Sequence, residues 1–504
     1  MINILEYLEN TPQPNKTAFT GENSSLTFEE LQKISRSVGS YLCGQNIYKQ
    51  PVAVFMGKSP EMIAAFFGVV YSGNYYVPLD TEMPEVRIRM ILEKITSSTM
   101  PMPPPLVICD NSTEELLTKW GYRTCNYNDI RNFAINETSL ANIRRQATDV
   151  DPVYVVFTSG STGVPKGVVA HHRAVIDYVS SLCDVLEIDE NTVFGNQSPL
   201  YLDACLKELF PTLKYGASTF LIPKSLFMFP IKLVEYITNN GINTVCWVAS
   251  AFSLVAGLGT LEKAVPSTLT TIAFGSEIFP QKHLSAWRKA LPQAKFVHLY
   301  GPTEATGMST FFIVNRDFDA NEPIPIGQPF PNREVVLLDE NGKVPKDGEP
   351  GEIHIRGNQL SLGYYADEEL TRKAFVQNPL SPFPDTLYKT GDLGYKNPEG
   401  QLVFISRKDH QIKHMGHRIE LAEIEIAARE MEGVEMVCVI FDKEKSRIIM
   451  FYTSREDATV EKNQVLAYLK TNLPRYMVPQ QINKLDSLPL TPGGKIDRVA
   501  LANR

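Results

Sequence analysis

The sequence lacks the features that mark several classes of protein. Its seven cysteines are scattered, with no CxxC pair and an odd total. This pattern argues against a disulfide framework or a zinc site and favours a reducing compartment. The net charge of −8 is opposite to the basic excess that nucleic-acid binders usually carry. We therefore expect a cytoplasmic protein that does not bind nucleic acid.

Long apolar segments are also missing. No stretch approaches the roughly 18 apolar residues that a membrane span needs, and the longest candidate, 62–70, is typical of a buried helix. The N-terminus has neither the basic flank nor the apolar run of a signal peptide. We therefore expect no membrane partner. With 504 residues, 43% of them hydrophobic and 21% charged, the chain is typical of a globular protein with two or three lobes.

Apolar runs alternate with helical patterns over most of the chain, which predicts an α/β fold with parallel sheets covered by helices. Strands are expected at Val52–Phe55, Val107–Cys109, Val153–Thr158, Asn243–Val248 and Thr271–Phe274, and a helix at Pro60–Tyr71. From about residue 326, short strands separated by turns predict a small antiparallel or barrel-like lobe. We thus expect a large N-terminal domain, 1–408, that includes this lobe (about 326–408), and a small α+β C-terminal domain, 409–504.

One motif stands out, the decapeptide Thr158-Ser-Gly-Ser-Thr-Gly-Val-Pro-Lys-Gly167 after a predicted buried strand. Glycines let backbone N–H groups approach an anion, hydroxyls donate hydrogen bonds, and Lys166 adds a mobile positive charge. These are the parts of a phosphate cradle. The motif is not a Walker loop, because Gly167 follows the lysine where GxxxxGK[ST] requires Ser or Thr. An ordinary flexible Gly/Ser loop is the alternative interpretation.

This decapeptide resembles the phosphate-loop signature of the adenylate-forming superfamily, which includes the adenylation domains of nonribosomal peptide synthetases, acyl-CoA synthetases and luciferases. Other motifs similar to those of the superfamily follow in order along nearly the whole chain. They are Leu26–Leu31, Ser72–Asp80, Tyr300–Glu304, Gly351–Ile353, Gly363–Tyr365, Tyr388–Asp392, Arg407–Lys413, Gly416–Glu420, Leu473–Pro479 and Pro489–Asp497. Chance does not produce so many matches in this order, and the length also resembles that of the D-alanine–carrier protein ligases.

The resemblance implies that the chain uses ATP and Mg²⁺. It assigns nucleotide binding to Thr158, Ser159, Gly160, Ser161, Thr162, Gly163, Lys166, Gly275, Ser276, Glu277, Tyr300, Gly301, Thr303, Asp392, Arg407 and Lys495. Glu304 would bind Mg²⁺, which prefers hard oxygen ligands. Asp392 and Arg407 would contact the ribose, and Tyr300 would stack on adenine. Thr158, Glu304 and Lys495 are the implied catalytic residues.

The superfamily uses one site for two steps, and the resemblance implies both here. A carboxylate attacks the α-phosphate of ATP, and Lys495 offsets the developing negative charge. The C-terminal domain then rotates about a hinge, implied at Asp409, so that a thiol reaches the acyl carbonyl. Two positions depart from the usual pattern: Ser406 replaces a glycine, and Leu202 replaces an aromatic residue. Both departures put a close assignment of substrate in doubt.

The segment Leu202–Phe210 aligns with the lining of an amino-acid pocket. Asp203 would pair with the substrate α-ammonium, because a carboxylate in an apolar pocket is costly unless a cation meets it. The implied pocket residues are Asp203, Ala204, Lys207, Trp247, Ile272, Phe274, Leu299, Gly307 and Met308, with Lys495. Lys207 would meet an acidic side chain, or would pair with Asp203 or reach solvent instead. The bulky walls also suit a small substrate such as alanine.

The sequence therefore predicts an enzyme that activates an amino acid as aminoacyl-AMP. Because the chain stops soon after Lys495, the acceptor is expected to be the phosphopantetheine thiol of a separate carrier protein, with coenzyme A as the competing acceptor. Two alternatives stay open: an acyl- or aryl-CoA ligase, and a non-catalytic nucleotide-binding protein of the same fold. A P-loop ATPase or kinase does not agree with the motif, and only ATP turnover that yields ADP would support it.

Overall fold

The computed structural model describes residues 1–97, 105–319, 322–443, 445–455, 458, 460–491 and 496–502. The chain divides into two compact units. The first comprises Met1–Thr81, Ser98–Val156 and Gly167–Ser406. The second comprises Glu82–Ser97, Phe157–Lys166 and Arg407–Arg504. Two short upstream segments, one of which contains most of the predicted phosphate loop, thus group with the C-terminal part of the chain.

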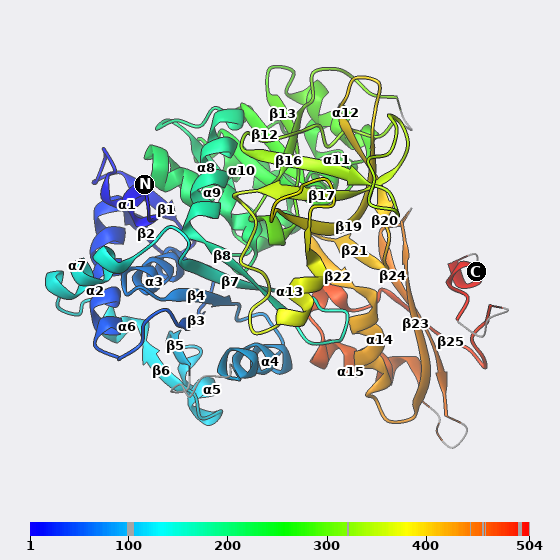
Figure 1. Ribbon diagram of the computed structural model, residues 1–504, viewed down its shortest axis with the longest axis horizontal. Coiled ribbons are helices and arrows are strands. Elements are labelled where there is room, and N and C mark those ends of the chain that lie inside the picture. The colour runs from blue at the N-terminus through cyan, green and yellow to red at the C-terminus, as the bar shows by residue number, and fades with distance from the viewer. Residues whose placement is uncertain are drawn as a thin grey trace. The chain divides into compact units, whose positions relative to one another are not determined.

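Two large sheets organise the first unit (Figure 1). The nine-stranded sheet has the order β15-β14-β13-β12-β11-β9-β10-β1-β2. Its strands are β1 (Thr17–Thr20), β2 (Ser25–Thr27), β9 (Val193–Asn196), β10 (Ser218–Leu221), β11 (Thr244–Val248), β12 (Thr271–Gly275), β13 (Lys295–Tyr300), β14 (Thr310–Ile313) and β15 (Gln328–Pro329). The pairs from β1 through β10, β9, β11 and β12 to β13 are parallel, and β2, β14 and β15 add antiparallel edges.

The second large sheet has six strands in the order β6-β5-β3-β4-β7-β8. They are β3 (Pro51–Phe55), β4 (Tyr75–Leu79), β5 (Leu106–Cys109), β6 (Arg123–Asn126), β7 (Pro152–Thr158) and β8 (Lys166–His171). The pairs from β6 to β7 are parallel. Parallel strands place their carboxyl ends at one edge, so the loop after β7 and the loop after β3 begin on the same edge of this sheet.

Helices of the first unit connect and cover these sheets. They are α1 (Leu5–Glu9), α2 (Phe28–Cys43), α3 (Pro60–Tyr71), α5 (Glu114–Lys119), α6 (Tyr127–Ile130), α7 (Glu137–Gln146), α8 (His172–Leu186), α9 (Leu206–Tyr215), α10 (Pro230–Asn239), α11 (Ala249–Gly257), α12 (Gln281–Ala290) and α13 (Glu368–Ala374), with the 3₁₀ helices η1 (Asp203–Cys205), η2 (Lys224–Met228), η3 (Thr260–Glu262) and η4 (Thr303–Ala305). Local sequence starts several of them: Ser59 caps α3 and Pro60 occupies its first turn.

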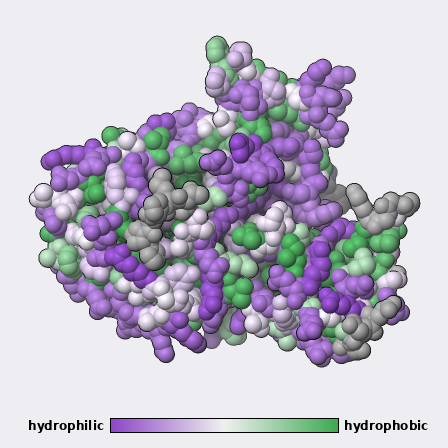
Figure 2. Space-filling model, turned by 60° about the horizontal axis from the view of Figure 1, so that its bottom comes forward, coloured by the Kyte–Doolittle hydropathy of each residue, from purple (hydrophilic) through white to green (hydrophobic). Residues whose placement is uncertain are grey.

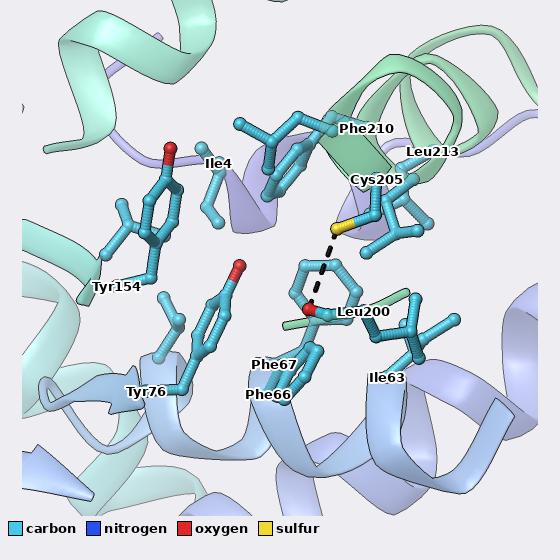
Figure 3. Close-up of a cluster of buried hydrophobic side chains, with 14 of the residues drawn as sticks. Ile4, Ile63, Phe66, Phe67, Tyr76, Tyr154, Leu200, Cys205, Phe210 and Leu213 are labelled. Carbon is cyan, nitrogen blue, oxygen red and sulfur yellow. Dashed lines mark hydrogen bonds between the residues drawn. The ribbon is translucent and has the colours of Figure 1, made fainter. Parts of the chain in front are cut away.

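The core of the first unit forms where α3 and α9 meet the sheets. Figure 3 shows Phe66 and Phe67 of α3 facing Cys205 and Phe210. The Cys205 thiol donates to the Leu200 carbonyl oxygen at 3.7 Å. Every residue of α3 except Glu61 is buried, so an apolar run that is too short for a membrane span serves as a core helix.

A smaller antiparallel sheet follows the two large ones. It has the order β16-β17-β19-β18, with β20 paired to β19. Its strands are β16 (Arg333–Leu338), β17 (Gly351–Gly357), β18 (Phe375–Gln377), β19 (Thr386–Lys396) and β20 (Leu402–Arg407). The prediction of a small barrel-like lobe is confirmed, while its bounds at about 326–408 stay a prediction.

The second unit has its own α+β core. It contains β21 (Gln411–His414), β22 (His417–Glu420), β23 (Val434–Asp442), β24 (Arg447–Ser454), β25 (Gln481–Lys484), α4 (Glu85–Thr96), α14 (Leu421–Arg429), η5 (Arg475–Met477), α15 (Lys462–Asn472) and α16 (Arg498–Ala502). In Figure 1, α14 and α15 lie beside β23 and β24, and their apolar faces form one buried cluster. The predicted α/β fold class with a small C-terminal α+β part is therefore confirmed, while the boundary at 408/409 stays a prediction.

The face drawn in Figure 2 shows few continuous apolar areas among the described residues. On the face drawn in Figure 2, the described residues are mostly hydrophilic, and hydrophobic ones occur in small separate groups. Among the described helices, none combines the length and the apolar content that crossing a membrane requires. All seven cysteines are free thiols, as their scattered spacing predicts.

Candidate active site

The predicted phosphate loop connects β7 to β8. Thr158 ends β7, and its buried Oγ1 has no hydrogen-bond partner within the described residues. The loop folds back at Gly160, whose carbonyl accepts from the Gly163 N–H at 3.1 Å. A Cβ on Gly160 would lie 2.0 Å from the Val164 carbonyl oxygen, so only glycine fits this turn. The loop is therefore a tight turn that requires glycine at this position.

Within the second unit, this loop contacts carboxylates. The Gly160 N–H donates to Glu423 Oε2 at 3.3 Å, and Lys166 Nζ lies 3.9 Å from Glu420 Oε1. The Ser159 hydroxyl donates to the Arg418 carbonyl oxygen at 2.6 Å. The loop amide and Lys166 thus lie against two carboxylates of the second unit.

Glu423 is itself held by a buried ion pair with Arg87. Arg87 Nη1 lies 2.5 Å from Glu423 Oε1, and both side chains are buried. Burial raises the pKa of Glu423, and the Arg87 charge opposes that rise. Neither residue is recognisable as functional from the sequence, because the two are 336 positions apart and no local motif joins them.

Glu304, the predicted magnesium ligand, has no exposed surface and lies in η4 directly after β13. The Tyr364 hydroxyl donates to Glu304 Oε1 at 2.6 Å. Tyr364 is fixed in turn because the segment Gly363–Tyr365 pairs with β8 through an isolated bridge to Val168. Tyr364 lies in the sequence motif Gly363–Tyr365, but only the fold shows that it bonds to Glu304.

The donor set at Glu304 fits magnesium only if a substrate supplies most of the oxygen ligands. Among the described residues, no cluster of three or more His, Cys, Asp or Glu side chains is arranged to hold a metal. Mg²⁺ is commonly bound by one or two carboxylates together with substrate phosphates. A single buried carboxylate therefore fits the ion when the ion arrives with a nucleotide.

Asp392 and Tyr300, both predicted to contact the nucleoside, are bonded to each other. The Tyr300 hydroxyl donates to Asp392 Oδ2 at 2.5 Å, and the Asp392 N–H donates to Thr390 Oγ1 at 2.9 Å. Both side chains are buried, Tyr300 at the end of β13 and Asp392 on β19. The hydrogen bond orients the carboxylate that is predicted to receive the ribose hydroxyls.

Arg407 and Asp409, the predicted ribose ligand and hinge residue, form a two-pronged ion pair in the second unit. Arg407 Nε lies 2.7 Å from Asp409 Oδ1, and Nη2 lies 2.8 Å from Oδ2. Burial acts to raise the pKa of Asp409, but the hydrogen bonds and charge of Arg407 outweigh it and lower the pKa. Any hinge motion at Asp409 would therefore act directly on Arg407.

Three further residues that are predicted to bind the nucleotide lie at the end of β12. Gly275 ends that strand, and Ser276 has a positive φ of 66°, which is a strained conformation for a residue with a side chain. Glu277 Oε2 accepts from the Ser250 N–H at 2.9 Å. Lys495, the predicted catalytic lysine, lies outside the described residues.

The predicted amino-acid pocket begins at η1. Asp203 and Ala204 start this 3₁₀ helix and are partly exposed, while Lys207 lies in the first turn of α9 and is 2% exposed. Burial raises the pKa of Tyr154 and Tyr178 well above the usual value, and the Asp203 charge adds to that rise. The Asp203 carboxylate therefore lies near two buried tyrosines.

The predicted wall residues fall on opposite faces of the nine-stranded sheet. Trp247, Ile272 and Phe274 pack in the cluster with α10–α12, and Trp247 Nε1 donates to the Gly195 carbonyl oxygen at 2.7 Å. Leu299 and Met308 pack in the cluster that contains α9. Alternation along a strand explains the split, because Leu299 pairs with Gly275 and not with Phe274.

Gly307 is also constrained. Its φ is +80°, and a Cβ there would lie 2.6 Å from the Tyr178 ring. No side chain other than hydrogen fits this position without displacing the tyrosine.

Comparison with known proteins identifies the family. A family model described as AMP-binding enzyme matches residues 8–365, and one described as AMP-binding enzyme C-terminal domain matches residues 423–495. The chain belongs to the AMP-binding enzyme family. The matched ranges contain Thr158, Glu304, Asp203 and Lys495, and the predicted resemblance to adenylate-forming enzymes is confirmed.

Individual AMP-binding relatives differ in how much of their length this chain spans. It is 32% identical over 505 residues to bacitracin synthase 1 of Bacillus licheniformis, covering 97% of this chain but only 9% of that protein. It is 28% identical over 510 residues to the D-alanine–D-alanyl carrier protein ligase of Bacillus cytotoxicus, covering 99% of this chain and 98% of that one.

Solved structures share the fold of this AMP-binding enzyme at low identity. An o-succinylbenzoate CoA synthetase from Bacillus subtilis superposes with a TM-score of 0.84 at 22% identity, over 100% of this chain and 99% of the other. An NRPS protein containing adenylation and PCP domains gives a TM-score of 0.84 at 24% identity, over 99% and 84%. The fold is therefore common to enzymes with different acceptors.

Proposed function

We propose that this chain activates an amino acid as aminoacyl-AMP, releases pyrophosphate, and transfers the aminoacyl group to the phosphopantetheine thiol of a separate carrier protein. The observation that carries the proposal is Asp203, a carboxylate at the start of η1 beside buried Tyr154 and Tyr178. A carboxylate at the edge of a largely apolar region is a suitable partner for a cation. The α-ammonium of an amino acid supplies that cation, whereas a fatty or aryl acid does not.

In the first step, the substrate carboxylate attacks the α-phosphate of ATP and pyrophosphate leaves. The loop of Thr158, Ser159, Gly160 and Lys166 would bind the phosphates, since its amide and lysine contact carboxylates in this structure. Glu304, oriented by Tyr364, would hold Mg²⁺, which when bound neutralises phosphate charge. Lys495 would offset the charge that develops in the transition state.

In the second step, a thiolate attacks the acyl carbonyl and AMP leaves. We propose that the C-terminal domain, 409–504, rotates about Asp409 between the steps, so that Lys495 serves only the first. The Arg407–Asp409 ion pair supports this assignment, because motion at the hinge would move a side chain that is proposed to contact the ribose.

Pyrophosphate exchange tests the proposal. The purified chain with ATP, Mg²⁺ and amino acids of both enantiomeric series is expected to exchange labelled pyrophosphate. Deaminated analogues of the active amino acid should fail, because Asp203 would lose its partner. Acyl transfer is then measured with phosphopantetheinylated carrier protein and, in parallel, with coenzyme A.

Other results would favour the alternatives. Exchange with deaminated acids and transfer to coenzyme A would indicate an acyl- or aryl-CoA ligase, an acceptor named for one structure of the same fold. Formation of ADP in place of AMP would indicate a different reaction. The absence of exchange with any acid would contradict the proposed activity.

A further inference from the structure

Arg333 is a fully buried arginine at the start of β16, outside the sequence motifs described above. Its side chain has no exposed surface, whereas that of Glu334, the next residue on the strand, is exposed. Side chains alternate along a strand, and this alternation turns Arg333 inward. Arginine is almost never fully buried unless it is paired, so the groups that it contacts define its role.

The Arg333 guanidinium joins helix α8 to the segment 301–308, which follows β13. Its Nη2 lies 3.0 Å from Oδ2 of Asp177 on α8, and its Nη1 donates to the Met308 carbonyl oxygen. The second oxygen of Asp177 accepts from Asn332 Nδ2 at 2.6 Å. The backbone at Met308 is therefore tied to α8 through the arginine side chain.

The charges of this contact balance, because one guanidinium meets one carboxylate. Burial lowers the pKa of Arg333, and the Asp177 charge opposes that change. The planar guanidinium presents several donors in a fixed fork, so it can bond a carboxylate and a carbonyl at the same time. A lysine at this position would keep the charge but would not hold both partners.

Arg333 also lies over the ring of Tyr178. Its Cζ is 5.6 Å from the ring centroid of Tyr178, within the range of a cation–π contact. The same ring fills the space beside Gly307, where a Cβ would lie 2.6 Å from it. Burial raises the pKa of Tyr178, the Asp203 charge adds to that rise, and the Arg333 charge opposes it. Tyr178 therefore lies near both the buried arginine and the carboxylate that is proposed to bind the substrate.

The other end of the same segment is held by different contacts. Tyr300, directly before it, donates to Asp392, and Glu304 within it accepts from Tyr364. These residues are proposed to contact the nucleotide and magnesium. Loss of the arginine contact should therefore displace the Met308 end of the segment and leave the nucleotide end in place.

We propose that Arg333 is a positioning residue for the amino-acid substrate, which fixes the Met308 backbone and the Tyr178 ring and so sets the shape of the pocket without touching the substrate. Asp177 acts together with Arg333 as one unit. This inference rests on the proposed function, because it assigns a role in binding the amino acid to residues outside the predicted pocket.

The test measures KM separately for the two substrates of the adenylation step. Pyrophosphate exchange is followed with the best amino acid and with ATP. Arg333→Met should raise KM for the amino acid by about 10-fold or more and leave KM for ATP nearly unchanged, since a misplacement of about 1 Å costs up to about 100-fold. Arg333→Lys should give a smaller rise. A loss of folded protein alone would lower the total activity without changing either KM.

A double-mutant cycle tests whether Asp177 acts through Arg333. Asp177→Asn alone should also raise KM for the amino acid. Combined with Arg333→Met, it should add little, because both changes break the same contact. Additive effects on KM would show that the two residues act separately, and would contradict the proposed unit.

Arg356→Met is the matched control. Arg356 lies on β17 of the same sheet and pairs with Glu334 and Asp385, but its side chain is 47% exposed. Its replacement should leave both KM values unchanged. Arg333 variants that raise both KM values equally, or that change neither, would overturn the inference while the proposed function stands.

The remaining outcomes are also decisive. If the acid that supports exchange has no amine, the proposed function fails, and the KM comparison with that acid still decides the role of Arg333. If Arg333→Met does not fold, Arg333→Lys decides, because it keeps the charge opposite Asp177. The absence of exchange with any acid would contradict both the proposed function and this inference.

Discussion

Tyr364 donates a 2.6 Å hydrogen bond to Oε1 of Glu304, a carboxylate with no exposed surface. The tyrosine is held by β8, which also leads back to the phosphate loop along the chain. The contact therefore sets the orientation of the only residue that is proposed to hold magnesium. Its effect on the reaction is directly measurable.

We expect Tyr364→Phe to lower kcat/KM for pyrophosphate exchange by about 10-fold to 100-fold, since a buried hydrogen bond to a charged group is worth about 1.5–3 kcal/mol. The Mg²⁺ concentration for half-maximal activity should rise as well. Tyr236→Phe, a tyrosine on α10, is the control. An unchanged Mg²⁺ dependence in Tyr364→Phe would contradict the assignment of Glu304 as the metal ligand.

Gly160→Ala should abolish most adenylation without unfolding the protein. The new methyl group would lie 2.0 Å from the Val164 carbonyl oxygen, so the loop must open and its amides move. A misplacement of about 1 Å in a catalytic site costs on the order of 100-fold in rate. Pyrophosphate exchange and the melting temperature are measured together. Gly57→Ala, where a Cβ meets nothing within 4 Å, should be nearly neutral.

The buried Arg87–Glu423 pair should stabilise the second unit. Arg87→Met leaves Glu423 as an uncompensated buried charge, which costs about 3–5 kcal/mol of unfolding free energy. Replacing both residues with methionine should cost less than the single change. Arg36→Met breaks a pair whose partner Glu137 is exposed and should change stability by at most about 1 kcal/mol. Urea unfolding, followed by a probe in each unit, provides the measurement. A double variant that is less stable than Arg87→Met would contradict this view.

His172 should make the first unit sensitive to mild acid. Burial lowers the pKa of His172 to about 3, and its Nδ1 accepts from the Ile4 N–H at 3.3 Å. In the unfolded chain His172 binds a proton near pH 6.5. In the folded protein it stays neutral at that pH, because burial disfavours its charged form. Unfolding free energy should therefore fall as the pH drops below about 6.5, with a slope approaching about 1.4 kcal/mol per pH unit from this group.

His172→Gln should flatten that slope between about pH 6 and pH 4, even if it lowers stability at neutral pH. Exposed His410→Gln serves as the control and should leave the slope unchanged. Equal slopes in His172→Gln and the unmodified protein would show that the histidine is protonated in the folded state.

Sequence patterns predict the local elements of this fold well and the long-range contacts poorly. Helix α3 is predictable because Ser59 and Pro60 mark its start and an apolar run follows. The order of strands in the nine-stranded sheet is not predictable from the sequence, because β1 pairs with β10, which lies about 200 residues later. No periodicity in the sequence encodes such a pairing.

In the candidate site, too, local motifs are predictable from the sequence and long-range contacts are not. Motif residues such as Glu304 and Asp392 are predictable, but the hydroxyls that orient them, from Tyr364 and Tyr300, follow from tertiary structure. The burial of Lys207 is equally invisible in the sequence, where a lysine on a helix is normally exposed. Its neighbour Glu208 bonds to Asn196, which also accepts from Lys58, and these contacts join three different segments of the chain.

Gly307 has a further consequence for how the specificity of this enzyme can change. Any added atom there collides with the Tyr178 ring, so a larger residue at this position would have to displace that tyrosine. Access to new substrates must come through positions that tolerate a change of size or charge, and Lys207 is the first candidate. A library that randomises residue 307 should yield mostly inactive clones, while one at 207 should yield active clones with altered preference.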